Sequence, residues 1–181
     1  KLEDSSYLIF EPKKDLIKKK YYKINTYKAV NDENIALNDL EELLYSAIEK
    51  RLISSPSTLL SGGVDSSLIS SIYTKISGRK IDTFSIGYNE YKNYCELQYA
   101  KITSNHINSN HHEIIIDKKK YIDSFYNTLE FFDEPHGDSA AVPLNFLLKN
   151  VKDFGVNSLL SGEGADELFF GYDNYAKFLK Y

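Results

Sequence analysis

Apolar residues recur at three- and four-residue spacing along several stretches of the chain, and this period predicts amphipathic helices. The first predicted helix begins at Leu37, where Asn38 followed by Glu41 indicates an N-cap. The second ends at Gly78, a residue typical of helix C-termini. Further helices are predicted over about 95–107, 121–131 and 142–154, and a last one starts near Ala165.

Short apolar or alternating runs separate these helices and predict strands. They are "STLLS" at 57–61, "IDTFSIG" at 81–87, "HEIII" at 112–116 and "VNSLLS" at 156–161. Strands that alternate with helices are typical of βαβ units. The predicted fold class is therefore α/β, with a mostly parallel sheet and helices on both faces.

The first 34 residues differ from the rest, because they are rich in Lys, Tyr and Asn. "SYLIF" at 6–10 and "YYKI" at 21–24 predict two short strands. We expect residues 1–34 to be a linker or the remnant of a preceding domain, and residues 35–181 to form the main domain. The chain begins at Lys1 and contains no Met, so we expect it to be a piece of a longer protein.

Two glycine-containing turns, "SGGVDSS" at 61–67 and "SGEGADE" at 161–167, each follow a predicted strand and precede a predicted helix. Parallel sheets bind ligands at the carboxyl ends of their strands. Both turns therefore mark one candidate edge.

The first turn has the chemistry of an anion site. Gly62 and Gly63 let a ligand approach the backbone, and the following helix presents free N–H groups, most naturally to phosphate. Ser61, Ser66 and Ser67 add hydroxyl donors. Asp65 would repel phosphate unless a cation such as Mg²⁺ lies between them. The alternative, in which Asp65 caps the helix, remains open.

The second turn places Glu163, Asp166 and Glu167 within five residues. Acids in a first helical turn favour the macrodipole, so capping again explains them. A shared metal or cationic substrate would also relieve their repulsion. Asp166 could then complete a Mg²⁺ site with Asp65, which leaves Glu163 for proton transfer. No lysine follows the glycines as in a P-loop, and the dinucleotide fingerprint lacks its third glycine. The residues alone indicate a nucleotide-binding α/β domain with Mg²⁺.

The amino-acid composition limits the classes of partner and the cellular setting that we expect for this chain. A net charge of −4 and a pI near 5.6 argue against nucleic acid, and the lysine runs 18–20 and 118–120 are expected to be solvated surface. A single Cys95 excludes a disulfide framework and favours a reducing, cytoplasmic setting. No apolar run approaches the length of a membrane span. The four histidines lack the spacing of a zinc site.

Five segments in order carry a family resemblance: "LLSGGVDSS" from Leu59, "FSIGY" from Phe84, "HHEIII" from His111, "DEP" from Asp133 and "LLSGEGADELFFGY" from Leu159. Over residues 37–181 the chain resembles the synthetase domain of glutamine-dependent asparagine synthetases. Those enzymes are N-type ATP pyrophosphatases with a fold of the adenine nucleotide alpha hydrolase type. The match departs at Phe170, where glycine is frequent and where we expect tolerated packing variation.

The resemblance implies an ATP-dependent ligase. ATP would adenylate a carboxylate, aspartate above all, pyrophosphate would leave, and ammonia from a glutaminase domain would displace AMP. Relatives that amidate sugar acids or other carboxylates remain an alternative, as does a fragment that binds nucleotide without turnover. The family's essential lysine lies beyond Tyr181, and a homodimer is left open.

The resemblance also implies residue roles. Ser61, Gly62, Gly63, Asp65 and Ser66 would hold the β- and γ-phosphates. Leu59, Ile86, Ser161 and Gly162 would line the adenosine site. Asp65 and Asp166 would ligate Mg²⁺, Glu163 would be the base, and Glu167 would lie near the metal and pyrophosphate.

Overall fold

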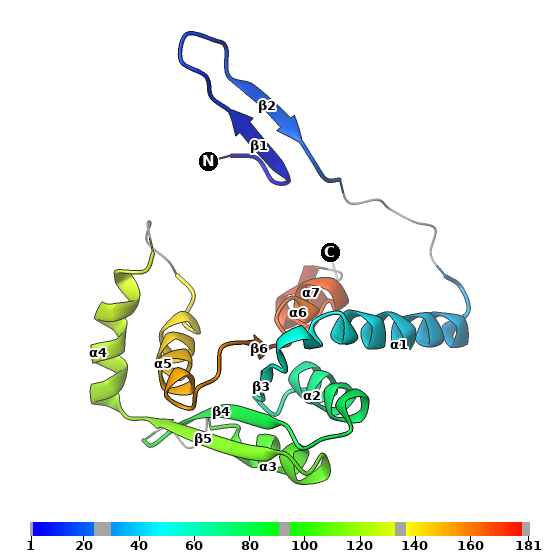
Figure 1. Cartoon of the computed structure of the whole chain (residues 1–181), viewed down its shortest axis with the longest axis vertical. Coiled ribbons are helices and arrows are strands. Elements are labelled where there is room, and N and C mark those ends of the chain that lie inside the picture. Colours follow the sequence, from blue (N-terminus) through cyan, green and yellow to red (C-terminus); the bar gives the residue numbers. More distant parts are fainter. Residues whose placement is uncertain (1, 24–29, 91–94, 133–136, 179–181) are drawn as a thin grey trace. The chain divides into compact units, whose positions relative to one another are not determined.

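The computed structural model describes residues 2–23, 30–90, 95–132 and 137–178 (Figure 1). It divides into two compact units, Lys1–Asp39 and Leu40–Tyr181. The division falls a few residues after the predicted boundary at residue 35. That the first unit is a linker or the remnant of a preceding domain stays a prediction.

The first unit contains a β-hairpin. Strand β1 (Ser6–Ile9) pairs antiparallel with β2 (Ile17–Lys20), and Ser6 lies opposite Lys20. The prediction for β1 is confirmed, but the second strand predicted at "YYKI" is wrong: β2 ends at Lys20, and Ile24 lies outside the described residues. Cross-strand pairing, which no local apolar pattern reveals, selects the exposed lysine run instead.

Helix α1 (Glu33–Glu49) begins before the predicted start at Leu37. The Asp32 carboxylate accepts hydrogen bonds from the backbone N–H groups of Asn34 and Ile35, at 2.9 and 3.2 Å. Asp32 is therefore the cap, and the predicted cap Asn38 lies inside the helix. The cap that the structure uses thus lies six residues before the predicted one.

The second unit alternates short strands and helices. Its strands are β3 (Ser57–Leu59), β4 (Asp82–Tyr88), β5 (Asn110–Ile116) and β6 (Leu159–Leu160). Its helices after α1 are the 3₁₀ turn η1 (Leu52–Ser54), α2 (Val64–Ser77), α3 (Leu97–His106), α4 (Lys118–Leu129), α5 (Ala141–Asp153), α6 (Ala165–Phe169) and α7 (Asp173–Phe178). Gly78 caps α2 in the left-handed conformation, as predicted.

The four strands form one parallel sheet in the order β5-β4-β3-β6. The chain moves outward from β3 through β4 to β5 and then returns to the other side of β3 with β6. The strand order therefore reverses between β3 and β6. In open α/β sheets this switch point is where the carboxyl ends of the strands leave a crevice for ligands.

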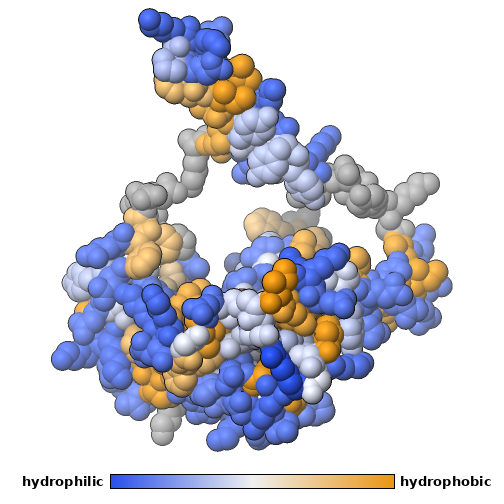
Figure 2. All heavy atoms as spheres, in the orientation of Figure 1, coloured by the Kyte–Doolittle hydropathy of each residue, from blue (hydrophilic) through white to orange (hydrophobic). Residues whose placement is uncertain are grey.

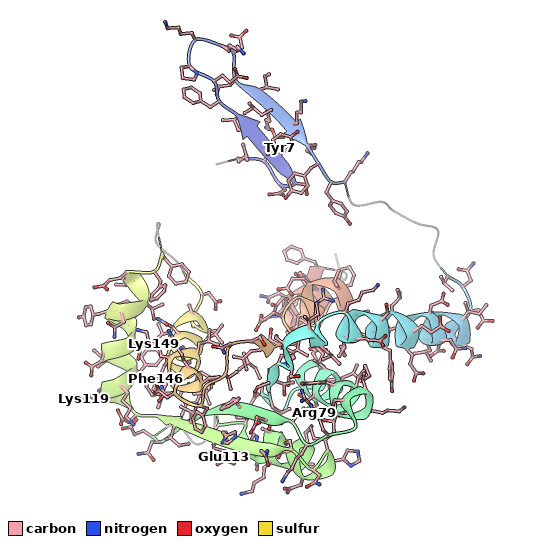
Figure 3. All side chains as sticks on the ribbon, viewed as in Figure 1. Tyr7, Arg79, Glu113, Lys119, Phe146 and Lys149 are labelled. Carbon is pink, nitrogen blue, oxygen red and sulfur yellow. The ribbon has the colours of Figure 1, made fainter. Side chains whose placement is uncertain are left out.

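Helices cover both faces of this sheet, so the predicted fold class is confirmed. Figure 1 shows α4 and α5 side by side on one flank, with α2 and α3 on the other. On the α5 face, Phe84 and Ile114 pack with Leu147 and Val151. Phe146, labelled in Figure 3, adds to this cluster. A second cluster joins Ile48 of α1 with Ile72 and Tyr73 of α2.

Hydrophilic residues predominate on the face shown in Figure 2, and apolar residues form separate groups there. Both lysine runs are exposed, which agrees with their predicted place on the solvated surface. Among the described residues, none of the helices combines the length and apolar character needed to span a membrane.

The face of the sheet toward α3 carries smaller and polar side chains, and His111 lies among them. Its Nδ1 is 2.9 Å from the Thr83 hydroxyl. Its Nε2 is buried, has no hydrogen-bond partner among the described residues, and lies 3.9 Å from the carboxylate of Glu113, labelled in Figure 3. Burial lowers the pKa of His111, and the charges of His112 and Lys101 lower it further, whereas Glu113 raises it.

We expect this histidine to make the fold acid-sensitive. An unfolded histidine binds a proton near pH 6.5, whereas the folded His111 resists it, so the free energy of unfolding falls as the pH drops below that value. The slope from one such group is at most about 1.4 kcal/mol per pH unit. The free energy of unfolding, measured with urea between pH 7.5 and 5, should fall less steeply with decreasing pH in His111→Gln than in the wild type. In His106→Gln, which changes an exposed histidine, it should fall as steeply as in the wild type. Equal pH profiles for the wild type and His111→Gln would contradict the assignment.

Candidate nucleotide-binding site

A cleft of about 510 Å³ opens at the switch point between β3 and β6. Both glycine-containing turns line it, as the shared sheet edge predicted. Two of the predicted residues, Gly62 and Ser67, do not line this cleft. The others do: Leu59, Ser61, Gly63, Asp65, Ser66, Ile86, Ser161, Gly162, Glu163, Asp166 and Glu167. The volume is within the range of small-molecule sites.

Serine hydroxyls hold the first turn in shape. The Ser61 and Ser66 hydroxyls are 2.9 Å apart, and Ser66 Oγ also accepts from the Ser61 N–H at 3.2 Å. Ser61 Oγ in turn accepts from the Gly63 N–H at 3.2 Å. Ser67 was predicted as a further donor to the ligand, but its hydroxyl is 2.9 Å from that of Thr103 on α3 and it does not line the cleft. The turn is thus held by hydrogen bonds among its own residues.

The two glycines of the first turn have different roles. Gly63 is the N-cap of α2 and lines the cleft. Gly62 adopts φ +93°, and a Cβ there would lie 2.5 Å from the backbone nitrogen of Ala100 and 2.7 Å from the Cβ of Tyr99. Gly62 therefore allows α3 to pack against the turn, and this contact by itself requires a glycine. The phosphate contact of Gly62 stays a prediction.

Asp65 lies in the first turn of α2 and faces the cleft, while Gly63 occupies the N-cap position. This placement favours the ligand-facing alternative over capping. The second turn packs directly on this residue, because a Cβ at Gly162 would lie 3.0 Å from the Asp65 Cβ and 3.1 Å from the Ser66 backbone nitrogen. Glycine at 162 thus brings the two turns into contact.

The second turn begins α6 with Gly164 in the left-handed conformation at φ +93°. Glu163, Asp166 and Glu167 all line the cleft. Tyr172 Oη donates a 2.7 Å hydrogen bond to Glu167 Oε1. This bond lowers the pKa of Glu167 and raises the pKa of Tyr172 to about 12.

Phe170 ends α6 at φ +59°, in the left-handed region that favours glycine. Its side chain is exposed and meets Tyr175 edge-on, with ring centroids 5.6 Å apart. An L-residue at this φ carries backbone strain, so any cost of phenylalanine here comes from the backbone and not from packing in the core. That the variation is tolerated stays a prediction.

An apolar wall of the cleft was not found from the sequence. Phe84 of β4 and Pro143, Leu144 and Leu147 of α5 form it with the predicted Leu59 and Ile86. The period of two along β4 places Phe84 and Ile86 on one face, so the sequence could have predicted Phe84 together with Ile86. The contribution of α5 depends on tertiary packing alone. The cleft thus offers an apolar side for a ring and an acidic, N–H-rich side for a charged group.

The described residues contain no group of three or more His, Cys, Asp or Glu side chains that could hold a metal ion by themselves. Mg²⁺ commonly binds through one or two carboxylates together with substrate phosphates and water. Asp65 and Asp166, in one cleft, fit that pattern. The "DEP" segment at Asp133 lies outside the described residues.

Comparison with known proteins finds one family that matches most of the chain. Residues 39–180 match the asparagine synthase family. The chain is 33% identical over 177 residues to asparagine synthetase [glutamine-hydrolyzing] 1 of Bacillus subtilis. The aligned region covers 97% of this chain and 28% of the relative. It is 29% identical over 163 residues to asparagine synthetase B of Escherichia coli, covering 81% of this chain and 29% of the relative.

These relatives are much longer than the chain, which spans less than a third of each. Among solved structures, NMN synthetase from Francisella tularensis matches 75% of this chain and 58% of its own, at 19% identity and a TM-score of 0.49.

Proposed function

Because the chain belongs to the asparagine synthase family, we propose that it is the ATP-binding synthetase part of an amide ligase that converts a carboxylate, aspartate above all, into its amide. One observation carries the proposal: two turns bearing the predicted acids meet in one cleft, with Gly162 against Asp65. The relatives are named as glutamine-hydrolysing enzymes, so ammonia would come from a glutaminase domain. We expect this chemistry to take place in the cytoplasm.

The cleft supports a specific pose for ATP. The purine would lie against the apolar wall near Leu59 and Ile86, and the triphosphate would extend toward the first turn. There the backbone N–H groups at the start of α2 and the helix dipole favour anions. Asp65 and Asp166 would hold Mg²⁺, which would supply positive charge to stabilise the departing pyrophosphate.

The proposed reaction has two steps, adenylation of the carboxylate and then amide formation. A carboxylate oxygen attacks the α-phosphorus of ATP, the bond to the bridging oxygen breaks, and pyrophosphate leaves. Ammonia next attacks the acyl carbon, AMP departs, and one proton must be removed. Glu163 lines the cleft and is exposed, so its carboxylate is available to accept that proton.

The acyl substrate is tested by its products. Release of AMP and pyrophosphate by the full-length protein should be measured with aspartate and with a panel of other carboxylates, sugar acids included. Turnover with aspartate supports the proposal. Turnover with another acid and none with aspartate would keep the reaction class and replace the substrate.

Asp65→Asn should weaken Mg·ATP binding about tenfold, equivalent to about 1.4 kcal/mol. Asparagine caps helices as well as aspartate does, so this substitution tests the charge and not capping. Calorimetry on the two proteins measures the difference.

The matched control is Asp153→Asn, at the last residue of α5, which is exposed and does not line the cleft. It removes the same charge and should bind like the wild type. Unchanged affinity in Asp65→Asn would remove the metal assignment, and no binding by the wild type would remove the ATP site.

A further inference from the structure

The segment after α6 folds back onto the acids of that helix. The Gly171 N–H donates to the Asp166 carbonyl at 3.0 Å, and the Tyr175 N–H donates to the Tyr172 carbonyl at 2.9 Å. A Cβ at Gly171 would collide with the carboxylate of Asp166. The reversal therefore returns Gly171 and Tyr172 to the residues that begin α6.

Within this reversal, Tyr172 is placed to hold Glu167. Its hydroxyl donates to Glu167 Oε1 at 2.7 Å, and both residues line the cleft. Its ring meets Tyr175 edge-on, with centroids 5.5 Å apart, so the phenol is itself supported. A tyrosine phenol is protonated at physiological pH, so Tyr172 is the donor in this bond.

The physical consequence is pre-organisation. Glutamate is a long, rotamer-rich side chain, and Glu167 is exposed, so an unrestrained carboxylate would lose conformational freedom on meeting a ligand. The hydrogen bond occupies one carboxylate oxygen and limits that loss before the ligand arrives. The same bond links Glu167 to the segment whose Gly171 N–H donates to the Asp166 carbonyl.

We propose that Tyr172 is a positioning residue for Mg·ATP, acting through its hydrogen bond to Glu167. The inference rests on the proposed nucleotide site and assigns Tyr172 no contact with the substrate.

A double-mutant cycle tests it on the full chain, with Mg·ATP as the calorimetric probe. Tyr172→Phe should weaken Mg·ATP binding about two- to tenfold, because the Glu167 side chain would then have to be immobilised when the ligand binds. Glu167→Ala should weaken it by at least as much. The double variant should bind no more weakly than Glu167→Ala, because a residue that acts only through Glu167 has nothing left to position.

Tyr175→Phe is the control, because it removes a neighbouring hydroxyl and leaves the Tyr172–Glu167 bond in place. It should bind like the wild type, and urea midpoints of all variants show whether the fold is kept. Multiplicative losses in the cycle, or an unchanged affinity in Tyr172→Phe, would overturn the positioning role while the nucleotide site stands. A wild type that binds no Mg·ATP would overturn both.

Discussion

Gly62→Ala should lower the free energy of unfolding by about 2–5 kcal/mol. An L-residue in the left-handed region costs about 1–2 kcal/mol, and overpacking adds about 1–3 kcal/mol. Gly62 incurs both, because it has φ +93° and its missing Cβ would lie 2.5 Å from the Ala100 backbone. The crowding atoms belong to the backbone and to Tyr99 Cβ, which cannot rotate away as a side-chain tip could.

Gly78→Ala separates these two effects. Gly78 also has a positive φ, +62°, but a Cβ there would meet nothing within 4 Å. Gly78→Ala should lower the free energy of unfolding by about 1 kcal/mol, from backbone strain alone. Urea unfolding of the wild type and both variants measures the difference. If Gly62→Ala were as stable as Gly78→Ala, α3 would have room to shift, and the contact between α3 and the first turn would not be a constraint on the fold.

Glu163→Gln should slow amide formation roughly a hundredfold or more, the usual contribution of a positioned general base. The substitution preserves shape and removes the proton acceptor. Proton removal belongs to the attack by ammonia, after adenylation, so ATP-dependent exchange of pyrophosphate should persist. The two rates, measured on the same full-length protein, should therefore separate.

Glu130→Gln provides the comparison, since Glu130 is an exposed residue at the end of α4 that does not line the cleft. It should change neither rate. If Glu163→Gln formed amide at the wild-type rate, another group would be the base. If it lost exchange and amide formation together, Glu163 would act in binding or adenylation.

Much of the site could be predicted because its residues are contiguous and its edge is determined by topology. Each turn directly follows a strand, and the carboxyl ends of parallel strands share one edge, so Asp65 and Glu163 had to approach each other once β3 and β6 became neighbours. The apolar wall is different in kind. Leu144 lies far along the chain from Leu59, and no spacing within α5 indicates which of its residues will face the cleft.

The order of strands β3 to β6 and of helices α2 to α6, and the two turns that form the site, were determined by the sequence itself, because hydrophobic period and glycine placement are local properties. The 3₁₀ turn η1 and the separate helix α7 were not predicted. Tertiary structure decided how those residues are used. It assigned Gly62 to the contact with α3, Ser67 to Thr103 and Tyr172 to Glu167. The physical reason is that side-chain contacts depend on which elements pack together, and packing sums weak interactions over the whole core, which no single stretch of sequence contains.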